Sequence, residues 1–260
     1  MLRPNRLKRR LQGGRPSLGC WLFSGSPVAT EILADCGFDA LLIDHEHSPG
    51  GIETAVEQLR AAAAGSATIL ARLPENRAAP VKRLLDMGVE GVIAANVEHV
   101  AEIEEVVAAA YYPPSGRRGA HFTVSRAAGW GADSDRYPQH AAEETLVIAM
   151  IESAAGVDAI PDMAKVGRID MFFVGPLDLS ASIGRMGDYA DRAFVEILGA
   201  AERRIIESGA ALGGAAMPGH DAGQLFARGY RFVTAASDVG FLRAGALSFV
   251  RESYREAEHG

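Results

Sequence analysis

The sequence predicts a (β/α)8 barrel, an α/β fold in which parallel strands alternate with helices. Short apolar runs rich in Ile, Val, Leu and Phe are followed, time after time, by amphipathic or Ala-rich stretches. Eight such pairs occur in order, which is the number that closes a barrel of this kind. The chain has 260 residues, a length that one-domain barrels commonly reach.

The expected strands are short and apolar on both faces, as is typical of parallel strands buried on both sides. They cover residues 18–23, 39–44, 67–72, 91–96, 146–151, 170–174, 211–217 and 231–236. The expected helices cover residues 27–36, 52–64, 77–86, 98–109, 154–165, 191–208, 219–228 and 239–257. A doubly wound open sheet is the competing fold. It favours a G-x-G-x-x-G turn after the first strand, whereas this chain has Phe23-Ser24-Gly25-Ser26-Pro27 there.

One connection is unusually long. Residues 111–142 separate the fourth helix from the fifth strand and include Arg117, Arg118, Arg126 and Trp130. Connections of this length usually carry function or are mobile. We therefore expect a lid or a wall of the active site. No linker indicates a second domain, so we interpret residues 1–260 as one barrel domain.

Composition and charge exclude several classes of protein. Hydrophobic residues make up 48% of the chain and charged residues 23%, which is ordinary for a globular protein. The net charge of −7 argues against general nucleic-acid binding. No apolar run approaches the roughly 18 residues of a membrane span, and the N-terminus lacks an apolar signal core. We expect a cytoplasmic protein with no nucleic-acid or membrane partner.

The N-terminus is locally basic. The first ten residues contain Arg3, Arg6, Lys8, Arg9 and Arg10 and no acidic residue. Such a segment could contact nucleic acid or an acidic lipid surface, but an isolated basic run is weak evidence for either. We favour a solvated helix, or a helix that docks on an acidic neighbouring subunit.

Polar residues follow most of the expected strands. In a barrel of this type the chemistry occurs at the carboxyl ends of the strands, so these residues converge on one rim. In chain order they are Asp44-His45-Glu46-His47, Arg72, Asn96, Glu152, Asp178 and Ser237-Asp238.

Glu152 and Asp178 are the candidate metal ligands. They follow adjacent apolar strands, and two carboxylates at one rim repel each other unless a cation lies between them. Oxygen ligands with open positions suit Mg²⁺ or Mn²⁺. The alternative is that Asp178 caps a turn and Glu152 forms a buried salt bridge. His45 and His47 are further possible ligands, because alternate residues of a strand share a face.

Lysine usage argues against one aldolase mechanism. Lys8, Lys82 and Lys165 are the lysines of the chain, and none ends a strand. A Schiff-base aldolase needs a lysine at its site. Carbanion chemistry in this chain would therefore depend on a metal ion as the electron sink.

Nine stretches together resemble the HpcH/HpaI aldolases, a family of class II, metal-dependent pyruvate aldolases. The resemblance runs from Leu18 to about Ala246. The stretches are LGCW at 18–21, FDALLIDHEHSP at 38–49, ARLP at 71–74, LLDMG at 84–88, YPPSGRRG at 112–119, SRAAGWG at 125–131, MIES at 150–153, FVGPLDLS at 173–180 and AASD at 235–238. The order and number of these stretches make the resemblance specific.

The resemblance implies a (β/α)8 barrel that assembles as a hexamer, a trimer of dimers, with the last helix exchanged between subunits. It implies Glu152 and Asp178 as ligands of Mg²⁺, Mn²⁺ or Co²⁺. His47 matches the catalytic base, and Asp86 matches the acid that pairs with this histidine, often across a subunit boundary. Arg72 matches the residue that stabilises the developing enolate oxygen.

The resemblance also implies a substrate-binding surface. The backbone N–H groups of Leu177 and Asp178 match those that hold the substrate carboxylate, and a turn that feeds a helix can bind an anion in this way. Met150 stands where many members have Gln, so a substrate hydrogen bond is missing there. His45 replaces a frequent Gly, and Ala94–His99 replaces a Pro-Met-Val-Glu-Thr type of segment.

The leading hypothesis is a carbon–carbon lyase. It would reversibly cleave a 4-hydroxy-2-oxo acid, either a hydroxy-oxo-heptanedioate or a 2-dehydro-3-deoxy sugar acid, to pyruvate and an aldehyde through a metal-stabilised pyruvate enolate. One alternative is a Mg²⁺-dependent acyl-CoA lyase of the citrate-lyase or malyl-CoA type, which would need a CoA site. The other alternative is a non-catalytic barrel that binds sugar acids.

Overall fold

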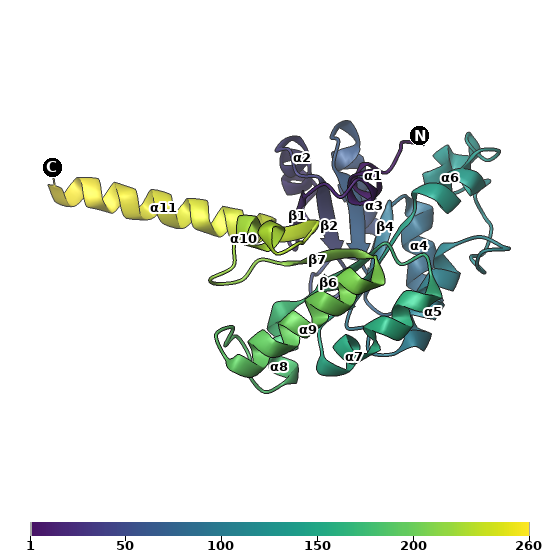
Figure 1. The fold of residues 1–260 in the computed structure, drawn as a ribbon. Coiled ribbons are helices and arrows are strands. Elements are labelled where there is room, and N and C mark those ends of the chain that lie inside the picture. The colour runs from purple at the N-terminus through teal and green to yellow at the C-terminus, as the bar shows by residue number, and fades with distance from the viewer. Residues whose placement is uncertain (1, 260) are drawn as a thin grey trace.

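Eight parallel strands form the centre of the protein (Figure 1). The computed structural model describes residues 2–259, and it describes side chains up to residue 255. The strands pair in chain order and the first pairs with the last, so the sheet is closed. They are β1 (Ser17–Leu22), β2 (Ala40–Asp44), β3 (Thr68–Arg72), β4 (Gly91–Ala94), β5 (Leu146–Ile151), β6 (Met171–Val174), β7 (Ala211–Ala215) and β8 (Phe232–Ser237). The predicted barrel is confirmed.

Helices follow the strands as the sequence predicts, with a few additional short helices. The predicted helices are α2 (Pro27–Asp35), α3 (Ile52–Ala61), α4 (Ala78–Met87), α5 (Val100–Ala110), α7 (Ala154–Met163), α9 (Arg192–Ser208), α10 (Ala222–Ala227) and α11 (Asp238–His259). The expected N-terminal helix is α1 (Arg6–Gln12). The additions are α6 (Tyr137–Glu144) and α8 (Pro176–Ser182), together with the short 3-10 helices η1 (Ala62–Ala64), η2 (Arg126–Gly131) and η3 (Ala164–Val166).

Side-chain caps explain where several helices begin. The hydroxyl of Ser153 and the carboxylate of Asp191 accept hydrogen bonds from first-turn N–H groups of α7 and α9. Asp221 and Gln224 form a reciprocal capping box. This box starts α10 at Ala222, whereas the sequence predicted a start at residue 219.

Two apolar layers hold the barrel together. The interior is filled by side chains that include Trp21, Met150, Phe173 and Phe232, while a larger layer packs between the strands and the helices. A Cβ atom at Gly19 would lie 2.4 Å from the ring of Phe232, so only glycine leaves room for that ring. The interior is therefore a packed core with chemistry confined to its ends.

The basic N-terminal segment closes the amino-terminal end of the barrel. Leu7 and Leu11 of α1 insert into the interior layer. The basic side chains pair with four acids that precede strands: Arg3 with Glu90 at 2.9 Å, Lys8 with Asp170 at 3.1 Å, Arg9 with Glu144 at 2.8 Å and Arg10 with Asp39 at 3.0 Å. The expectation of a helix is confirmed. Its docking surface, however, is the chain's own barrel rather than a neighbouring subunit.

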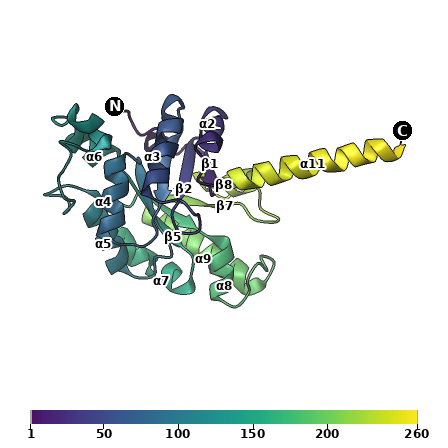
Figure 2. The ribbon, with the colours of Figure 1, turned by 180° about the vertical axis from the view of Figure 1, so that it is seen from behind.

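The long connection at residues 111–142 packs beside α4. Arg126 donates a 2.7 Å hydrogen bond to the carbonyl of Met87, and Figures 1 and 2 show α6 beside the N-terminus. Ala128, Tyr137 and Ala141 form a small apolar cluster there. Leu2 packs against the same cluster, whereas Val124 and Trp130 of the segment are exposed. A role as a lid or wall of the active site stays a prediction.

The last helix, α11, leaves the barrel and extends away from it (Figures 1 and 2). Its start is fixed by Asp238, whose carboxylate accepts the backbone N–H groups of Phe23 and Ser24 at 2.9 and 3.0 Å. Large apolar side chains of the helix, among them Leu242 and Phe249, are exposed. Over residues 2–259, helices are either too short or too polar to cross a membrane.

Candidate active site

The carboxyl ends of the strands bring together acidic and basic side chains. Asp44 and Arg72 end the paired strands β2 and β3, and Glu152 directly follows β5. Asp178 lies in the first turn of α8, which follows β6. The charges of Asp178 and Arg72 both act on the Glu152 carboxyl group, so these side chains lie near one another at the carboxyl end of the barrel.

Glu152 is a buried carboxyl group without a directly bonded cationic partner among the described residues. Only 6% of the residue is exposed, and one oxygen accepts the backbone N–H of Asn96 at 2.9 Å. Burial raises its pKa to about 7, and the negative charges of Asp178 and Glu46 add to the increase, against the opposing effects of Asn96 and Arg72. This environment excludes the simple buried salt bridge that was the alternative for Glu152.

The backbone around Glu152 is shaped to admit its carboxylate. Asn96 has a φ of 43°, a left-handed conformation that Asn adopts more readily than most residues, and its N–H donates to Glu152. A Cβ atom on Gly175 would lie 2.4 Å from Oε1 of Glu152. The glycine before α8 therefore keeps open a cradle in which the Glu152 carboxylate reaches the segment that carries Asp178.

This arrangement fits a hard divalent cation. Glu152 and Asp178 supply carboxylate oxygens, which Mg²⁺ and Mn²⁺ prefer. The described residues form no cluster of three or more His, Cys, Asp or Glu side chains suited to a metal ion. A cation here would thus take its remaining ligands from water or substrate, as Mg²⁺ usually does. His45 contacts the carbonyl of Gly50 at 3.1 Å through its Nδ1, while its buried Nε2 has no hydrogen-bond partner among the described residues, so His45 stays a possible ligand.

Arg72 is held rigidly by three neighbours. Its Nε donates to Asp44 at 2.7 Å, and its Nη1 lies 3.0 Å from Glu46. The guanidinium carbon stands 4.6 Å from the centre of the Trp21 ring. Burial alone would raise the pKa of Asp44, but Arg72 and two backbone N–H groups hold it below its usual value. Arg72 is thus an oriented, permanently charged group at the rim.

His47 is accessible at the same rim. Its side chain is 64% exposed, and its Nε2 lies 3.6 Å from the carboxylate of Glu46. Its backbone N–H donates to Asp44 at 3.0 Å, so the loop that carries the imidazole is anchored to the end of β2. The imidazole can reach a ligand that enters the barrel mouth.

The remaining predicted residues lie in different surroundings. Met150 is buried in the barrel interior, and Leu177 is half exposed in the first turn of α8. Asp86 lies in α4 outside the barrel, where its carboxylate accepts a 2.6 Å hydrogen bond from Arg118. Within this chain, the described contacts of Asp86 do not include His47.

Sequence reasoning missed the roles of Asp44, Glu46 and Gly175. Asp44 organises both Arg72 and the His47 loop through its two oxygens. The signal was present, because Asp44 ends a strand of a barrel and follows an apolar run. The individual partners could not be deduced, since Arg72 lies 28 positions further along the chain.

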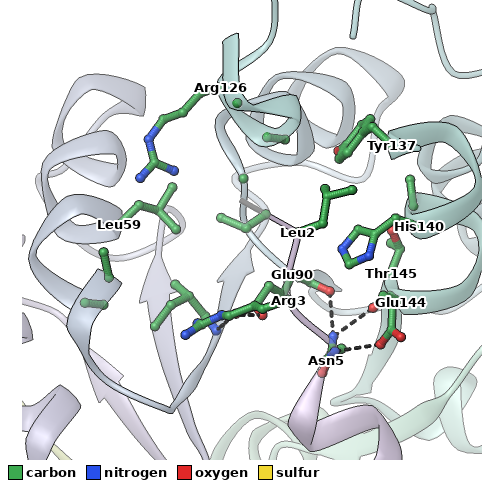
Figure 3. A pocket seen from close by; sticks show the side chains of 18 of the residues that line it. Leu2, Arg3, Asn5, Leu59, Glu90, Arg126, Tyr137, His140, Glu144 and Thr145 are labelled. Carbon is green, nitrogen blue, oxygen red and sulfur yellow. Dashed lines mark hydrogen bonds and ion pairs between the residues drawn. The ribbon is translucent and has the colours of Figure 1, made fainter. Parts of the chain in front are cut away.

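One cavity lies far from this rim, and another lies beside it. A cavity of about 450 Å³ lies at the opposite end, beside the N-terminal segment (Figure 3). Arg3 and Glu90 line it and pair with each other, and we interpret it as the place where the N-terminal segment packs. A cavity of about 390 Å³ lies at the mouth of the barrel, between Trp21, Phe23 and the end of β8.

The comparisons with known proteins agree with this geometry. The sequence profile of the HpcH/HpaI aldolase/citrate lyase family matches residues 17–244. A hydroxypyruvate/pyruvate aldolase of Deinococcus radiodurans is 35% identical, over 98% of this chain and 93% of the relative. A 5-keto-4-deoxy-D-glucarate aldolase of Shigella dysenteriae is 34% identical, over 93% of each chain.

A solved structure is also similar to this chain. A crystal structure of an HpcH/HpaI aldolase/citrate lyase family protein from Burkholderia cenocepacia superposes with a TM-score of 0.90 at 34% identity, over 96% of this chain and 99% of that one. The match therefore extends over nearly the whole fold as well as the sequence. The chain belongs to the HpcH/HpaI aldolase/citrate lyase family, and it is an enzyme of the aldehyde-lyase class.

Proposed function

We propose that this enzyme reversibly cleaves a 4-hydroxy-2-oxo acid to pyruvate and an aldehyde, with a divalent cation held by Glu152 and Asp178. One observation carries the proposal: a buried Glu152, its pKa raised to about 7, beside a second carboxylate. Relatives named for pyruvate and for a deoxy sugar acid support this substrate class. Among the sequence-based candidates, they favour the sugar acid over the heptanedioate.

The rim residues supply the steps of cleavage. His47 accepts the proton of the C4 hydroxyl, the C3–C4 bond breaks to release the aldehyde, and the electron pair is left on the pyruvate portion. Arg72 faces the 2-oxo oxygen, where that negative charge develops. A bound Mg²⁺, Mn²⁺ or Co²⁺ would supply Lewis-acid stabilisation of the same charge. Protonation at C3 then gives pyruvate.

Binding groups complete the proposed site. The N–H groups of Leu177 and Asp178, in the first turn of α8, hold the substrate carboxylate. The mouth cavity beside Trp21 and Phe23 takes the aldehyde portion. Met150 contributes an apolar surface where other members of the family have a hydrogen-bonding side chain.

Metal-dependent exchange of the pyruvate methyl protons with D₂O tests this function directly, because the half-reaction needs no aldehyde. NMR is expected to show exchange that stops in EDTA and returns with Mg²⁺ or Mn²⁺. His47→Ala should lower the rate about 10²–10⁴-fold while metal binding is retained. Absence of exchange with every metal would contradict the proposal, and saturable CoA binding would then favour the acyl-CoA lyase.

We also propose that the enzyme is a homo-oligomer, a hexamer built as a trimer of dimers, in which α11 packs on a second copy. Leu242, Phe249 and Val250 of α11 are exposed, and so are Val28 and Ile32, one helical turn apart on α2. These apolar faces complement each other between copies. Light scattering should give a hexamer, and Leu242→Asp with Phe249→Asp should give smaller species. A wild-type monomer would contradict the assembly.

A further inference from the structure

Two adjacent arginines of the long connection have opposite environments. The side chain of Arg117 is 63% exposed and pairs with Glu105. The side chain of Arg118 is fully buried and pairs with Asp86. Because the two residues share a loop and a charge, the difference between them is one of location alone, and it marks Arg118 as the unusual one.

Burial of the Arg118 guanidinium group in these surroundings is energetically unfavourable. Its Nη2 donates to Asp86 at 2.6 Å and to the hydroxyl of Tyr137 at 3.1 Å. The guanidinium carbon lies 4.7 and 5.7 Å from the ring centres of Tyr112 and Tyr137. Its Nε and Nη1 have no hydrogen-bond partner among the described residues. Since unmet buried donors are unfavourable, an apolar residue would fill this space at lower cost.

The arrangement around Arg118 fixes the position of the Asp86 carboxylate. The side chain of Asp86 is 15% exposed, in the last turn of α4. One of its oxygens is tied to a group that does not lose its proton in proteins, and two aromatic rings hold that group in place. The other oxygen has no hydrogen bond to the described residues. A carboxylate held in this way has a defined direction and a constant electrostatic partner.

We propose that Arg118 is a positioning residue for catalysis, which fixes Asp86 so that its second oxygen meets the imidazole of His47 in another subunit. The inference rests on the proposed function and on the pairing of Asp86 with that imidazole, which the family resemblance implies. Misplacement of a catalytic partner by about 1 Å can cost about 10²-fold in rate. Loss of a group that supports a catalytic side chain commonly costs about 10- to 100-fold.

The test compares four variants of the full-length enzyme by aldol cleavage and by pyruvate proton exchange. Arg118→Met and Asp86→Asn should each lower kcat about 10- to 100-fold, with the KM for pyruvate changed less than about twofold. The double variant should fall no further than the single variants, because both substitutions remove the same arrangement. Arg117→Met, the matched control, should keep the wild-type kcat. Light scattering and thermal unfolding check assembly and folding.

Different failures have different meanings. If Arg118→Met assembles normally and keeps its kcat while Asp86→Asn loses activity, the positioning role is overturned and the proposed function stands. If Asp86→Asn keeps full kcat, the pairing with His47 is wrong and the inference falls with it. Should Arg118→Met not fold, Arg118→Lys carries the comparison, with an expected several-fold loss of kcat because lysine lacks the planar fork. A wild-type kcat in Arg118→Lys would then overturn the role.

Discussion

Acidic residues have opposite environments at the two ends of the barrel. At the amino-terminal end, Asp39, Glu90, Glu144 and Asp170 each pair with a basic side chain of residues 3–10. At the carboxyl end, Glu152 is buried beside another carboxylate, and its pKa is raised to about 7. The first end is a neutralised, closed surface, whereas the second holds negative charge that a cation would relieve. Stability and function are thus placed at opposite ends of the same strands.

Replacing one carboxyl group with an amide at each end of the barrel should separate the roles in stability and in function most strongly. Glu152→Gln is expected to lower pyruvate proton exchange by about 10²–10³-fold or more, because a ligand for the cation is lost. Glu90→Gln should leave exchange unchanged but lower the free energy of unfolding by about 1–2 kcal/mol, since Arg3 loses its charged partner. A wild-type rate of proton exchange in Glu152→Gln would contradict the functional role of the carboxyl end.

The pH dependence of stability should show the same contrast without substrate. The folded-state pKa of Glu152, about 7, is above its usual value of 4.5. The burial penalty is therefore absent below pH 4.5 and fully present above pH 7, where it amounts to about 3 kcal/mol. In EDTA, Glu152→Gln should be more stable than the wild type at pH 8 and equal to it near pH 4.5.

Denaturant unfolding at several pH values measures this difference between wild type and variant, so other titrating groups cancel. Added Mg²⁺ or Mn²⁺ should stabilise the wild type more at pH 8 than at pH 5, because the ionised carboxylate is the ligand. A pH-independent difference between the two proteins would contradict the raised pKa of Glu152.

The sequence predicted the carboxyl end well, because topology alone brings strand ends together. Once the strands were assigned, Arg72, Glu152 and Asp178 had to share a rim. The sequence predicted much less about which acidic side chain pairs with which basic side chain. Whether a given acid meets a cation depends on contacts such as Lys8 with Asp170, 162 positions apart in the sequence, which no local pattern encodes.

The long connection illustrates the same limit. Its length indicated a functional segment, but its direction depends on where Tyr137 and Ala141 find apolar partners. These partners come from residues remote in sequence, such as Leu2. The basic N-terminus was similarly recognisable as a helix, while its docking surface became clear only from the burial of Leu7 in the barrel interior.

The smallest expected effects compare two neighbouring cations of α1. Burial raises the pKa of Asp170, and the charge of Lys8 at 3.1 Å works against that increase. Lys8→Met leaves a buried carboxyl group without its cation, so it should lower the free energy of unfolding by about 1–3 kcal/mol. The loss should shrink at low pH, where Asp170 is protonated.

Arg9 provides the matched control, because its side chain is 59% exposed and solvent screens its pairing with Glu144. Arg9→Met should change the free energy of unfolding by no more than about 0.5 kcal/mol. Both variants should keep the wild-type rate of proton exchange, since α1 lies at the end of the barrel opposite the rim. Equal losses in the two variants would show that net charge, rather than the pairing of one buried acid with one cation, stabilises this end.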